Sequence, residues 1–137
     1  MFKRTLTLGL TAGLLAGAAS LVYQKVYAGS LGYDFADIAT LPGIAAASVL
    51  GGLLAAVLYF LLTRWLGGRG EVLFNFVLMI LTFASIVAPF AIKLPLEAEA
   101  PELFPGLIVP MHFFPALAWF TLKPLFLKPI QPIPTSA

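Results

Sequence analysis

The feature that most constrains this chain is the absence of charge over long stretches. Between Asp37 and Arg64 there are 26 consecutive uncharged residues, more than the roughly 20 that an α-helix needs to cross a bilayer. Three further runs have 20, 21 and 20 uncharged residues, and they lie between Arg4 and Lys25, between Glu71 and Lys93, and between Glu102 and Lys123. The sequence therefore predicts four segments that cross a membrane.

These segments are expected to be helices, because in lipid every backbone N–H and C=O group must be paired inside the protein. None of them alternates between apolar and polar residues as the strands of a membrane barrel do. The predicted fold is all-α, a polytopic membrane protein built as an antiparallel bundle of four transmembrane helices. The transmembrane domain is placed at residues 1–126 and a proline-rich, extended tail at 127–137, with helices at about 5–27, 41–66, 72–92 and 104–124.

Composition agrees with a membrane environment. The 137 residues are 61% hydrophobic and 10% charged, and the mean hydropathy is +1.00, whereas a soluble domain of this size needs more polar surface to cover its core. The net charge of +2 is too small to indicate a nucleic-acid partner. The chain has no cysteine, which excludes disulfides, thiolate metal sites and thiol catalysis.

The lysines and arginines of the short loops predict the orientation. With the N-terminus in the cytoplasm, six of the eight basic residues lie inside, and only Lys25 and Lys93 lie outside. Five of the six acidic residues lie outside, and only Glu71 lies inside. Both termini are therefore predicted to be cytoplasmic. Trp65 and Trp119 are then expected at the inner membrane interface, where aromatic side chains gather.

Small residues recur every four positions in the first two segments. Such residues let two helix backbones approach closely in lipid. The first segment also has the basic start and small-residue end of a signal peptide, but its apolar run continues to Tyr23, so we interpret it as a transmembrane helix. We expect the first two helices to meet through Gly9, Gly13 and Gly17 on one side and Gly43, Ala47 and Gly51 on the other, with Ser48, Gly52 and Ala56 beside that stripe.

The third segment has a sparse polar side formed by Asn75, Thr82 and Ser85. We interpret these residues as structural groups that hydrogen-bond within the bundle, because a pore lining needs more polar residues. Pro89 is expected to bend or end this helix. In the loop before the second segment, Phe35 is expected at the lipid headgroups.

The fourth segment contains Pro105, Pro110 and Pro115. Pro115 removes a helical hydrogen bond and is predicted to kink the helix. His112, the only histidine in the chain, lies in the same turn. An ionisable residue at this depth of a membrane is a candidate for function.

Three interpretations of His112 are open. In the preferred one, a neutral His112 hydrogen-bonds a neighbouring helix or a carbonyl freed by proline. In the second, His112 is a cofactor-binding axial ligand of a haem or a chlorophyll-like pigment, and a bis-histidine haem would take its other ligand from another chain. In the third, it relays protons, although no membrane carboxylate is present to act with it. No catalytic residue, no metal site and no other cofactor is predicted.

Four features together resemble a known family. They are the small-residue first helix, the run GGLLAAVLYFLL in the second, the proline that closes the third and the pair Met111–His112 that opens the last. The pattern resembles an uncharacterised family of bacterial four-helix integral membrane proteins, a domain of unknown function, over about Thr5 to Leu122. The resemblance implies the four-helix fold and a bacterial cytoplasmic (inner) membrane, and it implies no activity. The triple proline and the proline-rich tail depart from the family pattern.

No enzyme is predicted, because the sequence offers no nucleophile–base pair, no phosphate loop and no metal cluster. We expect a non-catalytic structural protein, either an accessory subunit of a larger membrane complex or a homo-oligomer. Its predicted partners are the lipid bilayer and other membrane subunits or further copies of itself. The alternative is a small passive transporter or channel for a neutral or hydrophobic solute, since the membrane carboxylates that couple ions in transporters are missing.

Overall fold

The computed structural model describes residues 1–128, and all regular secondary structure in that part of the chain is helical. This confirms the all-α prediction. Most of the predicted tail at 127–137 lies outside the described residues. The elements are α1 (Phe2–Leu31), α2 (Leu41–Leu66), α3 (Gly68–Ser85), the short α4 (Ala88–Ala91), the 3-10 helix η1 (Pro101–Leu103) and α5 (Phe104–Phe126).

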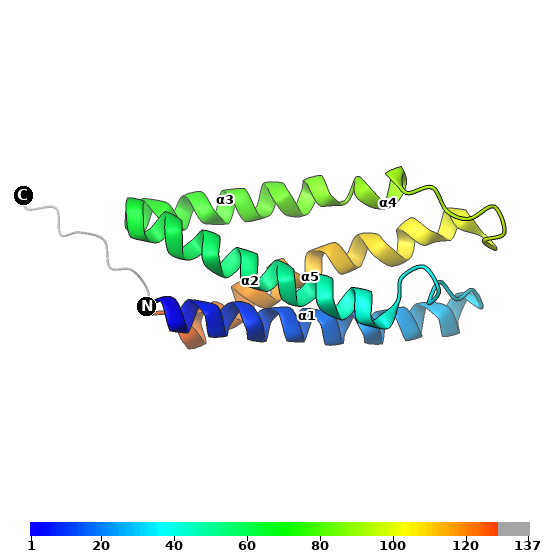
Figure 1. The fold of residues 1–137 in the computed structure, drawn as a ribbon, viewed down its shortest axis with the longest axis horizontal. Coiled ribbons are helices and arrows are strands. Elements are labelled where there is room, and N and C mark those ends of the chain that lie inside the picture. Colours follow the sequence, from blue (N-terminus) through cyan, green and yellow to red (C-terminus); the bar gives the residue numbers. More distant parts are fainter. Residues whose placement is uncertain (129–137) are drawn as a thin grey trace, which may run out of the picture.

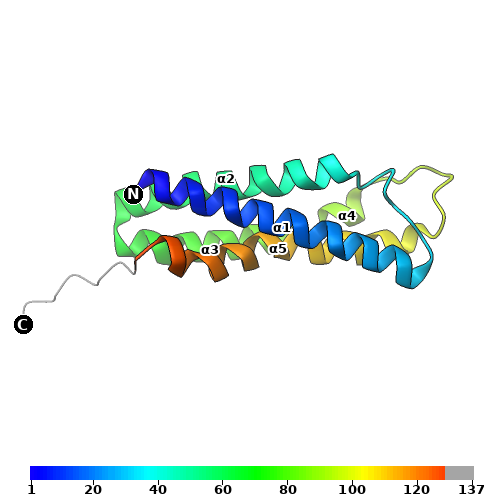
Figure 2. The same cartoon turned by 90° about the horizontal axis from the view of Figure 1, so that it is seen from below.

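Four helical spans are long and apolar enough to cross a membrane, as the hydropathy pattern predicts. They are Phe2–Leu31, Leu41–Leu66, Gly68–Ala91 and Pro101–Phe126. Figure 1 shows α1 and α3 running in one direction and α2 and α5 in the other. Seen from below in Figure 2, α1 crosses between α2 and α5, and it packs against both.

α1 and α2 approach closely through glycine, but the prediction of the contact is only half right. Gly9, Gly13 and Gly17 of α1 are buried, as expected. A Cβ atom added to Gly13 would lie 2.7 Å from the carbonyl oxygen of Ser48 and 2.8 Å from the Cα atom of Val49. The face that α2 presents to α1 consists of Ser48, Gly52 and Ala56, all buried.

The predicted α2 stripe of Gly43, Ala47 and Gly51 is therefore wrong as the contact with α1. A Cβ atom added to Gly51 would meet nothing within 4 Å. Adjacent residues of a helix point about 100° apart, and the two neighbouring stripes of α2 are equally small. The four-residue spacing of small residues therefore could not show which of the two stripes contacts α1.

Pro89 ends the helical pairing of the third segment, as predicted. Proline has no N–H group to donate to the carbonyl four residues earlier, and here that carbonyl belongs to Ser85, the last residue of α3. Between α3 and Pro89, the N–H groups of Ile86 and Val87 donate to carbonyls only three residues earlier, those of Phe83 and Ala84, both at 3.2 Å. The short helix α4 then begins at Ala88.

The first interhelical loop is packed onto α1 and α5. Phe35 is 4% exposed and meets the ring of Phe104 edge-on, with centroids 5.6 Å apart. The prediction that Phe35 lies at the headgroups is therefore wrong. The side-chain amide of Gln24 donates to the carbonyl of Ala39 at 2.7 Å, so a buried polar group of α1 fastens the loop in place.

α5 remains helical through Pro110, Pro115 and Pro124. Pro110 cannot donate to the carbonyl of Gly106. The hydroxyl of Tyr23 donates to that oxygen at 3.0 Å. α1 therefore replaces a hydrogen bond that α5 lacks.

Tyr23→Phe is expected to lower the free energy of unfolding by about 1 kcal/mol, because the Gly106 carbonyl then loses its substitute donor. In a Pro110→Ala background the helix supplies its own N–H group, so the same change should cost much less. Unfolding of the unaltered protein, the two single variants and the double variant in detergent measures both effects. Equal costs in the two backgrounds would show that Tyr23 does not compensate for Pro110.

Candidate functional site

A cavity of about 640 Å³ lies between α2, α3 and α5. Figure 1 shows α2 and α3 meeting at their connecting turn and diverging toward the other end of the molecule. The cavity is lined by residues of α2, α3 and α5, with Ser20 of α1 and residues 38–40 of the α1–α2 loop completing its wall. Its volume falls within the roughly 300 to 1,000 Å³ typical of small-molecule sites.

The wall from α2 is the small-residue stripe that the sequence analysis assigned to helix packing. Gly43, Ala47 and Gly51 all line the cavity. Larger side chains at these positions would project into the cavity, since the Cβ position of Gly51 has no neighbour within 4 Å. The stripe of Gly43, Ala47 and Gly51 therefore lines the cavity. The contact with α1 is made by the neighbouring stripe of α2.

His112 contributes to the wall from α5. Its Nδ1 atom lies 2.9 Å from the carbonyl oxygen of Ile108. Because a carbonyl only accepts, we assign the hydrogen to Nδ1, and in the neutral ring Nε2 is then an acceptor. The preferred interpretation predicted a hydrogen-bonded His112, but its partner is a residue of its own helix. The carbonyl of Ile108 is not one of those that lack a helical donor because of Pro110, Pro115 or Pro124.

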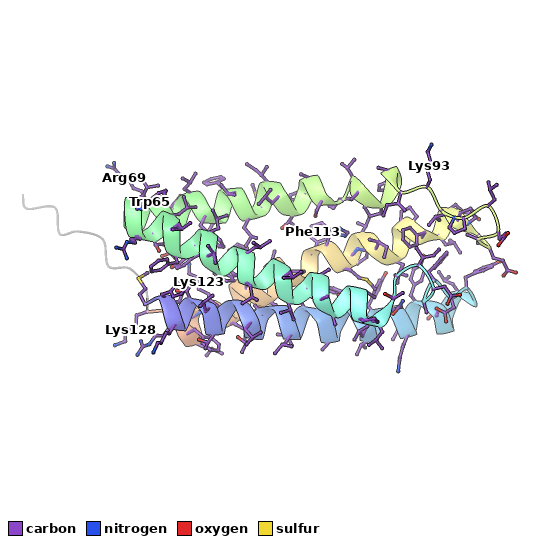
Figure 3. The ribbon with its side chains drawn as sticks, in the orientation of Figure 1. Trp65, Arg69, Lys93, Phe113, Lys123 and Lys128 are labelled. Atoms are coloured by element: carbon purple, nitrogen blue, oxygen red, sulfur yellow. The ribbon has the colours of Figure 1, made fainter. Side chains whose placement is uncertain are left out.

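The wall from α3 carries two hydroxyls, those of Thr82 and Ser85. Each donates within α3, to the carbonyls of Leu78 at 2.8 Å and Thr82 at 2.7 Å, and keeps lone pairs that can accept. Thr82 precedes Phe83, whose ring packs edge-on against the ring of Phe113 with centroids 5.7 Å apart. Phe113, labelled at the centre of Figure 3, follows His112. Thr82 and His112 therefore lie at the same level of the bundle.

Three aromatic rings, those of Tyr59, Phe74 and Trp119, pack together at the end of the cavity nearest the α2–α3 turn. The ring centroids are 5.1 Å apart for Tyr59–Phe74 and for Phe74–Trp119, and 5.7 Å apart for Tyr59–Trp119. All three are fully buried. The prediction that Trp119 lies at the membrane interface is wrong, because it belongs to this aromatic floor. Trp119 lines the cavity, and its Nε1 atom has no hydrogen-bond partner among the described residues.

Beyond the aromatic floor, Glu71 forms an ion pair with Lys123. The hydroxyl of Tyr59 donates to the same carboxylate at 3.4 Å, and the Lys123 ammonium lies 5.4 Å from the centre of the Tyr59 ring. The pair joins the first turns of α3 to the last turns of α5. Sequence reasoning missed this pair, although Glu71 was the one acidic residue on the predicted inner side.

Other predicted site features remain apart from the cavity. Asn75 does not line it, and its Oδ1 atom is buried without a partner in the described part of the chain. Within residues 1–128, no group of three or more histidine, cysteine, aspartate or glutamate side chains could hold a metal ion. Comparisons with protein-family models, curated proteins and solved structures find no match to this chain.

Proposed function

We propose that the chain is an integral membrane protein, an antiparallel bundle of four transmembrane helices in a bacterial cytoplasmic membrane with its N-terminus and the end of α5 on the cytoplasmic side. The length and apolar character of four helices support this topology. Figure 3 shows Arg69, Lys123 and Lys128 at the end of the molecule where the chain begins, and Lys93 at the other end. This asymmetry follows the positive-inside rule.

Within that membrane, the protein binds a neutral, mainly apolar solute without catalysis, and such binding is the first step of passive transport. The observation that carries this proposal is the cavity between α2, α3 and α5, because none of its lining residues in the described chain is charged. Burying an unpaired charge among such residues costs several kcal/mol. The cavity therefore selects against ions.

The mouth of the cavity supports entry from the bilayer. Ala47, Leu54 and Leu81 line the cavity and are also exposed at the protein surface. They lie on α2 and α3, so the opening is on the side of the bundle, between these two helices. In a membrane, this side faces the lipid chains. A solute dissolved in the bilayer reaches the cavity without passing through water.

A second candidate is the accessory-subunit function. A helix of a partner protein, or of a second copy, would occupy the same opening and pack on the stripe of Gly43, Ala47 and Gly51. The observation that favours it is the small size of this wall, since small residues allow close contact between helices in lipid. Mass measurement after gentle extraction of the native protein distinguishes the two candidates.

Ala47→Leu tests the solute-binding proposal, with Ala46→Leu as its matched control. Both alanines are exposed on α2, but only Ala47 lines the cavity. Filling the cavity should weaken binding of tritiated 1-hexadecanol to the protein in nanodiscs by about tenfold, the effect of overpacking an occupied site. Ala46→Leu should leave binding unchanged.

Equal binding by the two variants would contradict the proposal. Co-extraction of another polypeptide in fixed ratio, lost only in Ala47→Leu, would favour the accessory-subunit candidate instead.

A further inference from the structure

We propose that the ligand of the cavity is a neutral lipid with a carbonyl group, and that the hydroxyls of Ser20 and Ser48 donate hydrogen bonds to its carbonyl oxygen. This inference rests on the proposed function and names the class of molecule that the cavity takes. Long-chain esters and ketones share this chemistry.

The main evidence is a pair of buried hydroxyls without partners. Ser20 of α1 and Ser48 of α2 line the cavity and are 1% and 8% exposed. Neither hydroxyl has a hydrogen-bond partner in the part of the chain that the structure describes. Other helical hydroxyls donate to carbonyls three or four residues earlier, namely those of Thr5, Thr7, Thr11, Thr63, Thr82 and Ser85. Buried polar groups are nearly always paired, so the two serines call for a partner from outside the chain.

Both serine oxygens are accessible from the cavity. Within residues 1–128, the buried side-chain atoms that are fully covered and also unpaired are Oδ1 of Asn75 and Nε1 of Trp119. The oxygens of Ser20 and Ser48 are unpaired but are not among these covered atoms. Since both residues are otherwise buried and both line the cavity, their small exposed area lies on the cavity side.

The two hydroxyls lie close enough to share one acceptor. A Cβ atom added to Gly17 would lie 3.7 Å from the Ser48 hydroxyl oxygen. Ser20 is three residues after Gly17, so it occupies the next position on the same face of α1, about 5 to 6 Å away. A carbonyl oxygen has two lone pairs and can accept from two donors. One carbonyl oxygen placed between the serines therefore pairs both.

The other polar groups of the wall do not compete for this oxygen. The hydrogens of three of them are already donated within the helices, those of Thr82, Ser85 and His112. The oxygen of Thr40 caps α2 by accepting from the N–H group of Gly43 at 3.3 Å, and Thr40 is exposed, so its hydrogen is open to solvent. Ser20 and Ser48 are therefore the buried donors that a ligand acceptor would meet.

The position of the serines sets the orientation of the ligand. In Figure 1, α1 lies along the lower side of the molecule and α3 along the upper side. α1 packs on α2 and α5, whereas the mouth of the cavity lies between α2 and α3. Ser20 is thus on the wall opposite the mouth. The carbonyl group enters first, and the apolar chain extends from it toward the mouth and the lipid.

The test compares tritiated methyl hexadecanoate with tritiated hexadecane. Binding is measured for the full chain in nanodiscs and corrected with empty nanodiscs. The ester should bind more tightly than the hydrocarbon, by about fivefold for each of the two hydrogen bonds.

Ser48→Ala and Ser20→Ala each remove one donor and leave a small residue in place. Each should lower the preference for the ester about fivefold, while affinity for hexadecane stays within about twofold. The double variant should bind the two probes equally. Ser30→Ala is the matched control, because Ser30 is an exposed residue of α1 that does not line the cavity. It should keep the full preference.

The infrared carbonyl stretch of the bound ester is an independent measurement. With an isotope-labelled carbonyl carbon, the probe is resolved from the esters of the nanodisc lipids. Its stretch should lie at lower frequency in the unaltered protein than in empty nanodiscs, and this shift should disappear in the double variant.

Equal binding of ester and hydrocarbon by the unaltered protein, with no shift, would overturn this inference and leave the apolar binding site intact. The serine hydroxyls would then bond to water or to carbonyls of their own helices. A shift that persists in the double variant would also overturn it, because the donor would lie elsewhere. Failure of both probes to bind would overturn the proposed function as well.

Discussion

Gly52→Ala is expected to lower the free energy of unfolding by about 2 to 3 kcal/mol, the cost of overpacking a close contact. A Cβ atom at Gly52 would collide with the carbonyl oxygen of Gly9 and lie 3.0 Å from the amide nitrogen of Gly13. These are backbone atoms of α1, and they cannot rotate away as a side chain can. The two helices would have to separate along their whole glycine contact.

Gly51→Ala is the matched control, one residue earlier in the same helix. Its added methyl group meets nothing within 4 Å. Alanine is the better helix former, so we expect a gain of up to about 1 kcal/mol. Both variants can be measured by reversible unfolding in mixed detergent micelles, followed by circular dichroism. If α2 turned its Gly43, Ala47 and Gly51 stripe to α1, the order of the two effects would be reversed.

The helices could be predicted from the sequence because charge and proline mark their ends. α2 has the predicted bounds, from Leu41 to Leu66. α1 extends beyond the predicted 5–27 to Leu31, and its C-cap is Gly32 in a left-handed conformation, φ 76°, which glycine adopts without strain. The third helix was predicted at 72–92, but α3 begins at Gly68, because the chain reverses within Gly67 alone.

The rotation of each helix about its axis could not be predicted. In a soluble bundle the apolar face marks the core, but lipid is as apolar as a protein core, so hydrophobic residues do not distinguish the two. Leu50 and Leu54 of α2 are largely exposed, whereas the smaller Gly52 and Ala56 are buried. The stripe of Gly43, Ala47 and Gly51 was recognised as special, but its role depends on where α3 lies.

The candidate site could be predicted only in part for a similar reason. His112 drew attention because it is the only histidine, but Trp119 was placed at the interface because it lies near the end of an uncharged run. α5 continues to Phe126, so Trp119 is two turns inside its helix. The ion pair of Glu71 and Lys123 joins residues 52 positions apart. No local pattern relates them.

Glu71→Gln and Lys123→Met are each expected to lower stability by about 1 to 3 kcal/mol. The side chains are 25% and 16% exposed, so the loss lies between the values for surface pairs and for fully buried pairs. Each single change leaves the other charge without its partner beside the aromatic floor. The double variant should therefore cost about as much as one single variant, with an interaction energy of about 1 kcal/mol or more.

Arg69→Gln is the control for this cycle, because Arg69 lies two residues from Glu71 and its side chain is exposed. Its effect on stability should be within about 0.5 kcal/mol. The ion pair also connects the start of α3 to α5 below Tyr59, Phe74 and Trp119, so the single variants should weaken hexadecanol binding more than Arg69→Gln does. Strictly additive single and double effects would mean that the pair does not hold α3 against α5. The position of α3 would then depend on the aromatic contacts alone. Binding in the cavity would not depend on the charges of Glu71 and Lys123.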